Sequence, residues 1–578
     1  MNFFKKNWGL IAILLLSYWA IKPLLVPGFF PIHDNEQIGR LFDLNQALSF
    51  GEIPPRIAPN LGFGYGYLFF NFYPPLAYYI AEIFKIIGFS YIVSTKLMIG
   101  LGFLLGSFFM YLFSKEFFGK IGGIISAIFY TYAPYHAVDA YVRGALPEFW
   151  SMVFLPAIFW AIYKYRQTPR WQHFIFSIIF MSFLILVHNL VFVMAAPFIF
   201  AWIIFLSWDN KNKKKFLLGS LAILTMALLT TAYFWAPSFF EKQYTMVNLL
   251  TKELANYEQH FVCPLQFWNS PWGYGGSVTG CIDGMSFQIG KAQMLLSILA
   301  FFLAIKLFIA KKTKKLGIII FLLTAFLLFS IFMATSYSDL IWNRINFLWY
   351  IQFPWRFLIF CSFFSSFLAG AIALIPLPKK IMLTLAAIII FILISKSAKY
   401  FTPSKFFSYV TDRDYISQDV IRWDTSIISW EYVPRGIVTK KSDMDTTIID
   451  INKDEIAKSS FRVLTGDMRI ETIKNYPQEK EFFVFASEKS ILRINSFSYP
   501  GWKVFVDGQE VSYADNNKLK LITLKPLVGK HNILVKFTDT KVRFLSNLVS
   551  FISIITLIIF SLSRIIRFKP VLKAKPDL

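Results

Sequence analysis

The sequence contains few charged residues and few cysteines. Of its 578 residues, 16% are charged, 56% are hydrophobic and 3 are cysteine, which allows at most one disulfide within the chain. So apolar a chain is not an ordinary water-soluble protein, because it would expose large hydrophobic patches. No P-loop, dinucleotide-binding fingerprint, Ser/His/Asp arrangement or Cys/His zinc spacing occurs, so the sequence offers no site for a nucleotide-sugar.

The hydrophobic residues are grouped in stretches long enough to cross a bilayer. A membrane-spanning helix needs about 20 mostly apolar residues. The first stretch is expected to remain as a helix, because no small-residue cleavage site of a signal peptide follows it. The sequence predicts an α-helical polytopic membrane protein of about twelve transmembrane helices. They are expected at 8–26, 93–113, 121–137, 148–164, 172–188, 190–207, 216–237, 291–310, 315–335, 355–376, 380–396 and 545–563.

The basic residues separate the hydrophobic stretches instead of forming one patch. The formal net charge is +24, but its distribution between spans gives no reason to expect a nucleic-acid partner. The clusters are Lys5 and Lys6; Lys164, Arg166 and Arg170; Lys211, Lys213, Lys214 and Lys215; Lys311, Lys312, Lys314 and Lys315; Lys379 and Lys380; and Arg564, Arg567, Lys569, Lys573 and Lys575. Because short cytoplasmic loops are rich in Lys and Arg, we expect all of these clusters and both termini on the cytoplasmic side.

This topology divides the chain into three parts. Residues 1–396 are predicted to form a transmembrane module, 397–544 an extracytoplasmic domain, and 545–578 the final transmembrane helix and a basic cytoplasmic tail. The stretch 75–92 is a possible thirteenth span, but two charged residues interrupt it and an odd count would put the basic tail outside. We therefore predict an interfacial helix there. The outer loops of the module are 27–92, 138–147, 238–290 and 336–354.

The segment 397–544 differs in composition from the rest, with carboxylates, Asn and Thr in place of Phe and Leu. Asp507 and Gly508 lie between two runs of alternating hydrophobic and polar residues, which is a strong β-hairpin pattern. Residues 519–521 and 533–537 alternate in the same way. We predict a mostly-β, sandwich-like domain, for which a spacer or assembly role is the simplest explanation.

Two carboxylates of the first outer loop are candidate catalytic residues. Asp34 and Glu36 follow His33 near the start of loop 27–92. Asp34 could instead be the N-cap of a short surface helix. A capping carboxylate stays ionised, so that role would not prevent general-base catalysis. We predict a catalytic role for Asp34 and Glu36 and a substrate-binding role for His33.

The short second outer loop brings together Asp139, Tyr141, Arg143 and Glu148. Glu148 lies in the first turn of a predicted span, where the helix dipole alone would favour a negative charge. The functional hypothesis is that Glu148 and Asp34 converge on one outward cavity, with their carboxylates within roughly 10 Å of each other. Glu148 and Asp139 would then hold a divalent metal, Mg or Mn, beside a phosphate.

Several basic and aromatic residues lie at the outer ends of spans. Arg143 and Arg356 are predicted to bind the donor phosphate, which a guanidinium group matches geometrically, although anchoring at the interface explains them equally well. His188 and Tyr141 are further candidates for substrate binding. A structural histidine is the simpler explanation for His188.

The outer loop 238–290 contains two of the cysteines. An oxidising environment would favour a disulfide between Cys263 and Cys281 over two free thiols, and that bond would stabilise the fold by about 3 kcal/mol. Trp268 and Trp272 of this loop suit stacking on a sugar, but the aromatic belt of a membrane interface explains them more simply.

Four segments carry a resemblance to known membrane enzymes. They are His33-Asp34-Asn35-Glu36, Phe72-Tyr73-Pro74-Pro75-Leu76-Ala77-Tyr78-Tyr79, Tyr141-Val142-Arg143-Gly144-Ala145-Leu146-Pro147-Glu148 and Ile351-Gln352-Phe353-Pro354-Trp355-Arg356. In this order they resemble GT-C-type integral membrane glycosyltransferases. More closely, they resemble the bacterial membrane proteins labelled "6-pyruvoyl-tetrahydropterin synthase-related", a label that implies no pterin chemistry. The stretch 497–508 is similar to the C-terminal outer domain of YfhO-type proteins.

The resemblance implies that a sugar moves from a polyprenyl-phosphate donor to an extracytoplasmic acceptor, which is a cell-envelope glycan, lipid or protein. Transfer would occur on the outer face of a bacterial-type plasma membrane. Asp34 would act as the base or orient the acceptor, and Glu148 would bind a metal or the donor phosphate. The commoner first-loop pair is Asp-Glu, whereas here Asn35 separates Asp34 from Glu36, so either carboxylate remains a candidate base.

Two other classes of protein share this architecture. A lipid or glycolipid transporter would tend to place ionisable residues near the midplane of the membrane. Here the acidic residues are predicted outside, which favours an enzyme. A non-catalytic scaffold that displays the β domain is the stronger alternative, and replacement of Asp34 would distinguish it from an enzyme.

Overall fold

The computed structural model describes residues 2–251, 255–310, 312–442 and 446–567; of the basic clusters, Lys311, Lys569, Lys573 and Lys575 lie outside these ranges. The helices are α1 (Asn2–Leu16), α2 (Tyr18–Ile21), α3 (Gln37–Ser49), α4 (Leu76–Ile86), α5 (Tyr91–Thr131), α6 (Pro134–Ala137), α7 (Leu146–Gln167), α8 (Trp171–Val187), α9 (Asn189–Ser207), α10 (Lys213–Thr230), α11 (Ala232–Phe240), α12 (Lys291–Ile309), α13 (Lys314–Ala334), α14 (Asp339–Arg344), α15 (Leu358–Ala369), α16 (Lys379–Ser397), α17 (Arg413–Ile416) and α18 (Lys541–Arg567). The strands are β1 (Thr439–Lys441), β2 (Thr447–Ile449), β3 (Phe461–Thr465), β4 (Met468–Tyr476), β5 (Glu479–Phe497), β6 (Trp502–Val506), β7 (Gln509–Val511), β8 (Leu521–Thr523) and β9 (Leu527–Phe537).

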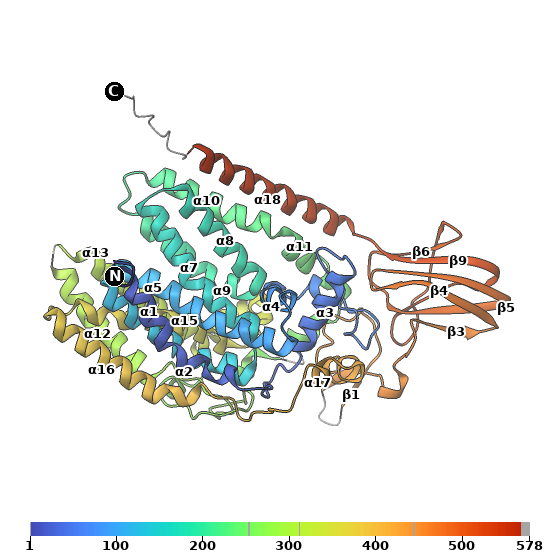
Figure 1. Ribbon diagram of the computed structural model, residues 1–578, viewed down its shortest axis with the longest axis horizontal. Helices are drawn as coiled ribbons and strands as arrows, with labels where there is room; N and C mark the ends of the chain where they lie inside the picture. The colour runs from blue at the N-terminus through green and yellow to red at the C-terminus, as the bar shows by residue number, and fades with distance from the viewer. Residues whose placement is uncertain (1, 252–254, 311, 443–445, 568–578) are drawn as a thin grey trace.

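A bundle of apolar helices makes up most of the molecule, and the β domain lies at one end of it (Figure 1). Within the described residues, nine helices are long and apolar enough to cross a membrane, or ten when the bent pair of α10 and α11 counts as one span. Every predicted span overlaps a helical segment. The number of these helices is smaller than the twelve predicted spans because α8 has only 17 residues and because α5 contains two of the predicted spans. The polytopic membrane fold is thereby confirmed.

Helix α5 is 41 residues long and folds back on itself at Gly119, whose φ is 67°. Glycine adopts this left-handed conformation without a steric penalty. Ser107 Oγ donates to the carbonyl oxygen of Ala127 at 3.5 Å, although the two residues are 20 positions apart. A straight helix would separate them by about 30 Å, so the two halves must run antiparallel. The first half and the second half of α5 correspond to the separate spans predicted from the sequence.

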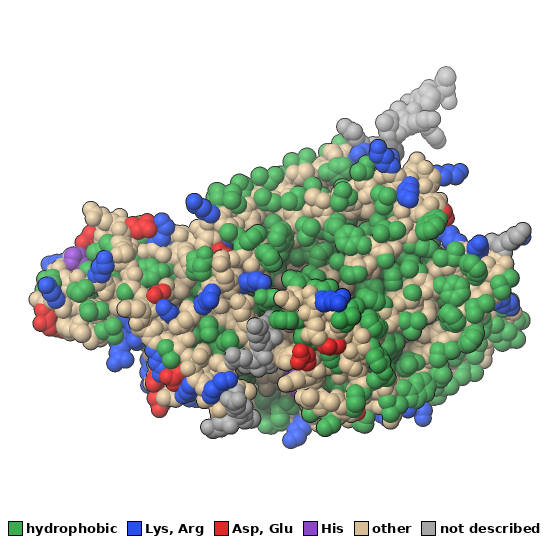
Figure 2. Space-filling model, turned by 180° about the vertical axis from the view of Figure 1, so that it is seen from behind, with side chains coloured by type: hydrophobic (Ala, Val, Ile, Leu, Met, Phe, Trp, Pro, Cys, Tyr) green, Lys and Arg blue, Asp and Glu red, His purple; other side chains and the backbone are tan. Residues whose placement is uncertain are grey.

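Charged side chains gather at the two ends of the molecule, and hydrophobic side chains cover much of the bundle surface between them (Figure 2). The end away from the β domain carries the loops next to α10 and α13 (Figure 1). There Asp209 pairs with Arg166 and with Lys315, both at 2.6 Å, and Lys164 pairs with Glu116 at 3.2 Å. Basic residues from two of the clusters therefore meet at one end of the bundle, as a single cytoplasmic face would require.

Loop 27–92 and the segment 401–435 cover the end of the bundle next to the β domain, which the sequence predicts to be its outer end. The apolar stretch predicted as an interfacial helix forms α4, whose 11 residues are too few to span a bilayer. The backbone of Phe29 pairs with that of Phe407. Asp412 accepts hydrogen bonds from the backbone N–H groups of Tyr91 and Ile92, at 2.8 and 2.9 Å, and so caps the start of α5. These two outer segments form one layer above the spans.

The β domain is built around the long strand β5, which has 19 residues. The first half of β5 pairs with β4 and β9, and its second half pairs with β3 and β8, so the seven strands form one continuous sheet instead of two separate ones. The predicted hairpin is present: β6 and β7 pair antiparallel around Asp507 and Gly508, which both have positive φ. The predicted mostly-β domain is therefore confirmed.

The last helix, α18, is fixed at its outer end by a buried ion pair. Glu241, at the end of α11, accepts a hydrogen bond from Arg543 Nε at 2.8 Å, and both side chains are buried. Thr540 also donates to Glu241, and Arg56 of loop 27–92 donates to Asn547 at 2.8 Å. The chain that leaves the β domain is thus tied both to the bundle and to the outer layer.

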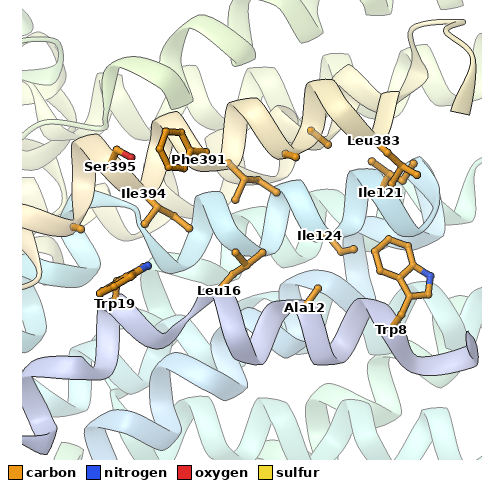
Figure 3. Close-up of a pocket in the computed structure, with 14 residues that line it drawn as sticks. Trp8, Ala12, Leu16, Trp19, Ile121, Ile124, Leu383, Phe391, Ile394 and Ser395 are labelled. Carbon is orange, nitrogen blue, oxygen red and sulfur yellow. The ribbon is translucent and has the colours of Figure 1, made fainter. Parts of the chain in front are cut away.

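A groove of about 600 Å³ lies between α1, α5 and α16 (Figure 3). Its lining is almost entirely apolar, with Trp8 and Trp19 near its two ends and Ser395 as a polar contribution from α16. The predicted catalytic and phosphate-binding residues do not line it. The groove is therefore separate from the candidate catalytic and phosphate-binding residues.

Candidate functional site

The first and second outer loops run side by side at the outer end of the bundle. The backbone N–H of His33 donates to the carbonyl of Val142 at 3.0 Å, and that of Asp34 donates to the carbonyl of Arg143 at 2.8 Å. Gly144 makes this approach possible, because it has a φ of 68° and a side chain there would collide with Ile32. The backbone of Asp34 therefore lies beside that of Arg143.

Glu148 lies between two arginines in the buried part of the site. Its carboxylate is 3.0 Å from Arg143 Nη1 and 3.1 Å from Arg356 Nε, and it is 1% exposed. The hydroxyl of Tyr135 also donates a hydrogen bond to the same carboxylate. Arg143 Nη1 also contacts Asp139 Oδ1 at 2.6 Å. Two arginines from segments more than 200 residues apart are thus held together by one carboxylate.

The local secondary structure explains how these side chains are positioned. Val138–Arg143 forms a π-helical turn, which places Asp139 and Arg143 four residues apart on the same side. Glu148 lies in the first turn of α7, where the positive end of the helix dipole favours a carboxylate. Arg356 lies in a short 3-10 turn before α15, and its Nη1 donates to the carbonyl of Ile351 at 2.5 Å.

Trp355 packs against Arg143. The guanidinium carbon of Arg143 lies 4.4 Å from the centre of the Trp355 ring, a cation–π contact. The indole N–H of Trp355 donates to Ser277 Oγ at 3.1 Å, and Ser277 also bonds with the ring of His260 at 2.9 Å. Ser277 belongs to the loop closed by the disulfide between Cys263 and Cys281, whose Cα atoms are 5.6 Å apart. The expected disulfide is present, and its loop contacts the arginine site.

The net charge of this cluster of two arginines and two carboxyl groups depends on whether Asp139 is protonated. Burial and the charge of Glu148 raise the pKa of Asp139 well above its ordinary value, against the opposing effect of Arg143. Asp139 is therefore the carboxylate of the cluster that is protonated, and so neutralised, most easily. When it does, Glu148 balances only one of the two arginines, and one positive charge remains for an anion such as a phosphate.

The two first-loop carboxylates lie in different surroundings. Asp34 is partly exposed and, within the described residues, its carboxylate makes no hydrogen bond or ion pair. It does not cap α3, because the residue before that helix is Glu36 and no side chain caps its start. Glu36 is 8% exposed and pairs with Arg40 at 3.0 Å. Burial raises the pKa of Glu36 to about 7, although Arg40 opposes this shift.

The remaining predicted residues lie around this centre with their polar groups already engaged. His33 is exposed, and its Nε2 is 2.9 Å from the carbonyl oxygen of Tyr274. Tyr141 is buried and donates its hydroxyl hydrogen to the carbonyl of Ala20 at 2.5 Å, so it ties α2 to the second loop. The imidazole ring of His188 interacts electrostatically with Arg356 and Glu148. The geometry thus favours a supporting role for Tyr141.

The donor set does not suit a metal ion at Glu148. Its two carboxylate oxygens are occupied by Tyr135, Arg143 and Arg356. Across the described ranges, no group of three or more His, Cys, Asp or Glu residues is arranged to hold a metal. The hypothesis that Glu148 and Asp139 bind Mg or Mn therefore finds no matching geometry, and arginines provide the positive charge of this site.

Sequence reasoning missed three residues of the outer site. Tyr135 lies in a stretch whose hydrophobicity predicts a span. Because its phenol is uncharged, no charge pattern indicates a functional role. Arg40 and Glu431 lie near Asp34: Arg40 bonds to Glu36 and to Ser429, and Ser429 lies 3.4 Å from Glu431. Glu431 comes from the segment before the β domain, which the sequence did not connect to the first loop.

Part of the chain matches a known family. Residues 73–235 match the family described as dolichyl-phosphate-mannose-protein mannosyltransferase. This range, less than half of the chain, contains Tyr135, Arg143 and Glu148, but it begins after Asp34 and ends before Arg356.

Three relatives resemble longer parts of the chain. An uncharacterized protein of Lactococcus lactis subsp. cremoris is 25% identical over 247 residues, which cover 41% of this chain and 40% of the relative. The apo oligosaccharyltransferase of Archaeoglobus fulgidus is 13% identical, with a TM-score of 0.44, over 71% of this chain and 57% of that one. The arabinofuranosyltransferase AftD from Mycobacteria is 14% identical, with a TM-score of 0.41, over 70% and 28%. This chain therefore spans less than two thirds of each relative. At the level of general class, the family match supports a membrane glycosyltransferase.

Proposed function

We propose that this protein is a membrane glycosyltransferase that moves a sugar from a polyprenyl-phosphate donor to an acceptor outside the membrane. The observation that supports it most is the position of Asp34 next to Arg143, which shares Glu148 with Arg356. Glycosyl transfer needs a base for the acceptor hydroxyl and positive charge for the departing phosphate. Asp34 would supply the first and the two arginines the second.

In the proposed reaction, Arg143 and Arg356 bind oxygens of the donor phosphate. Glu148 holds both guanidinium groups in position before the donor arrives. Asp34 accepts the proton of the acceptor hydroxyl while the hydroxyl oxygen forms a bond to the anomeric carbon of the sugar. The bond between that carbon and the phosphate oxygen breaks, and its electron pair leaves with the phosphate, where the arginines stabilise the charge. No step requires a metal.

We assign the site and the β domain to the outside of a bacterial-type plasma membrane, with both termini in the cytoplasm. The basic loops at the opposite end of the bundle support this orientation. The acceptor would then be a glycan, lipid or protein of the cell envelope. The closer resemblances to 6-pyruvoyl-tetrahydropterin synthase-related and YfhO-type proteins stay predictions.

The proposal is tested with Asp34→Asn in protein purified into lipid nanodiscs. The assay presents a panel of polyprenyl-phosphate-linked sugars with membrane-derived acceptors and measures release of the polyprenyl phosphate. We expect at least about a hundredfold loss of turnover, because a positioned general base contributes that much or more. The temperature of unfolding and the binding of farnesyl phosphate, a short probe for the donor, should not change.

The matched control is Asp424→Asn, which removes an exposed carboxylate and should leave turnover unchanged. Normal turnover of Asp34→Asn would show that Asp34 is not the base. If the unchanged protein neither binds farnesyl phosphate nor turns over any donor, a scaffold or transporter would be the better account.

A further inference from the structure

A buried arginine connects the first outer loop to the segment that leads into the β domain. Arg40, on α3, is 4% exposed. Its Nη2 donates to Glu36 Oε1 at 3.0 Å and to Ser429 Oγ at 3.1 Å. Its guanidinium carbon lies 4.9 Å from the ring centre of Phe69 and 4.6 Å from that of Tyr73. Arg40 is therefore enclosed between aromatic rings and two polar partners.

Ser429 extends this connection to a second carboxylate. Its hydroxyl group lies 3.4 Å from both carboxylate oxygens of Glu431. The backbone around Glu431 is fixed on both sides: Ser426 Oγ accepts a hydrogen bond from the N–H of Phe63 at 3.1 Å, and the N–H of Tyr432 donates to the hydroxyl of Tyr67 at 2.9 Å. Contacts to loop 27–92 thus hold Glu431 in place.

The acidic groups around Arg40 outnumber the positive charge available to them. Asp34 and Arg40 act electrostatically on both Glu36 and Glu431, and the two carboxylates act on each other. Four phenols also interact with one or both of them: Tyr73 with both, Tyr78 with Glu36, and Tyr67 and Tyr432 with Glu431. Glu36 Oε2 and Arg40 Nε are both buried without a hydrogen-bond partner in the part of the chain that the structure describes. Glu36 is buried, Glu431 is partly buried, and Arg40 is the cation that acts on both. Ionisation of both carboxyls beside one cation therefore costs free energy.

We propose that Glu36 and Glu431 form a carboxyl pair that holds one proton beside Asp34, and that Glu431 is a positioning residue of the acceptor side of the site. Burial raises the pKa of Glu36 to about 7 and also raises the pKa of Glu431. The pair therefore changes its charge by one unit near neutral pH, next to the proposed base. The contacts around Arg40 support the carboxyl pair without any assumption about activity. Its role towards the acceptor rests on the proposed function.

The test is an infrared titration of the purified protein in detergent micelles. A protonated carboxyl group has its own C=O band, and the difference between the unchanged protein and Glu36→Gln isolates this pair from other titrating carboxyls such as Asp43 and Glu52. We expect the isolated band to disappear with a midpoint of about pH 7.

The variant Glu431→Gln should move that midpoint down by about one pH unit, because one like charge is removed. Ser429→Ala should move it up, because the ionised pair loses a hydrogen bond while both carboxyls remain. Asp424→Asn, in the same segment but exposed, should leave it unchanged. A midpoint that stays the same in both Glu431→Gln and Ser429→Ala would overturn the proposal, and Ser429→Ala alone decides if Glu431→Gln does not fold.

The titration needs no donor or acceptor, so its failure can be told from failure of the glycosyltransferase proposal. If turnover of a donor is established, Glu431→Gln should move the pH dependence of kcat in the same direction as the infrared midpoint. A merely structural role would lower turnover at every pH without moving that profile.

Discussion

Replacement of Glu148 by Gln should be costly in a way that the structure allows to be estimated. The change keeps the size of the side chain but removes the charge that two arginines share at 3.0 and 3.1 Å. Glu148 is only 1% exposed, so water cannot replace it. Removal of one partner from a buried ion pair typically costs about 3–5 kcal/mol. We therefore expect a free energy of unfolding lower by about 3 kcal/mol or more.

The matched control is Glu116→Gln at the opposite end of the bundle. Glu116 also pairs with a basic residue, Lys164, but at 3.2 Å and with both side chains partly exposed. Pairs of that kind contribute about 0–1 kcal/mol. Both variants would be unfolded in the same detergent, with tryptophan fluorescence as the signal. Equal effects of the two substitutions would refute the buried cluster as the structure shows it.

A second measurement separates a structural cluster from a phosphate site. In the unchanged protein, an incoming phosphate must compete with Glu148 for the arginines. In Glu148→Gln this competition is gone, so farnesyl phosphate should raise the unfolding temperature more in the variant than in the unchanged protein. Farnesol, which lacks the phosphate, should not do so. A larger rise for the unchanged protein would mean that the positioning of the two arginines by Glu148 contributes more to anion binding than its competition costs, and would refute this prediction.

Three further results are expected. Arg356→Lys should weaken the binding of farnesyl phosphate about tenfold or more, because the planar fork of the guanidinium is lost, whereas Arg344→Lys should leave it unchanged; equal effects would favour simple interfacial anchoring. Cys263→Ser should remove about 3 kcal/mol of stability and speed proteolysis of its loop, and reduction of the unchanged protein should reproduce both effects. Cysteines placed at Lys213 and Lys530 should react with an impermeant reagent from opposite sides of the membrane; labelling from one side would contradict the topology.

The spans and the hairpin could be predicted from the sequence because their causes are local. A run of about 20 apolar residues is sufficient for a span, and Asp507-Gly508 between alternating strands is sufficient for a tight turn. The fold of α5 at Gly119 was predicted in effect, since two spans were expected there. What the sequence did not show is that seven of the strands, β3 to β9, join one sheet around β5, because that depends on pairing between distant segments.

The candidate site could be predicted only in part, for a similar reason. Arg143 and Glu148 are close in sequence, and the helix that begins between them explains their positions. The pairing of Glu148 with Arg356 bridges 208 residues, and no local pattern indicates it. The metal hypothesis treated Glu148 as a free carboxylate, whereas three neighbours occupy it. Glu431 was assigned to a separate domain and could be connected to Asp34 only through the packing of its segment.

The β domain is attached to the membrane bundle by two buried junctions. On entry, Asp412 caps α5 and Ser429 holds Arg40; on exit, Arg543 is bound to Glu241. A domain attached at both of its ends cannot reorient freely relative to the bundle. The distance from the sheet to Asp34 is therefore set by the protein, and thermal motion of the domain should change it little.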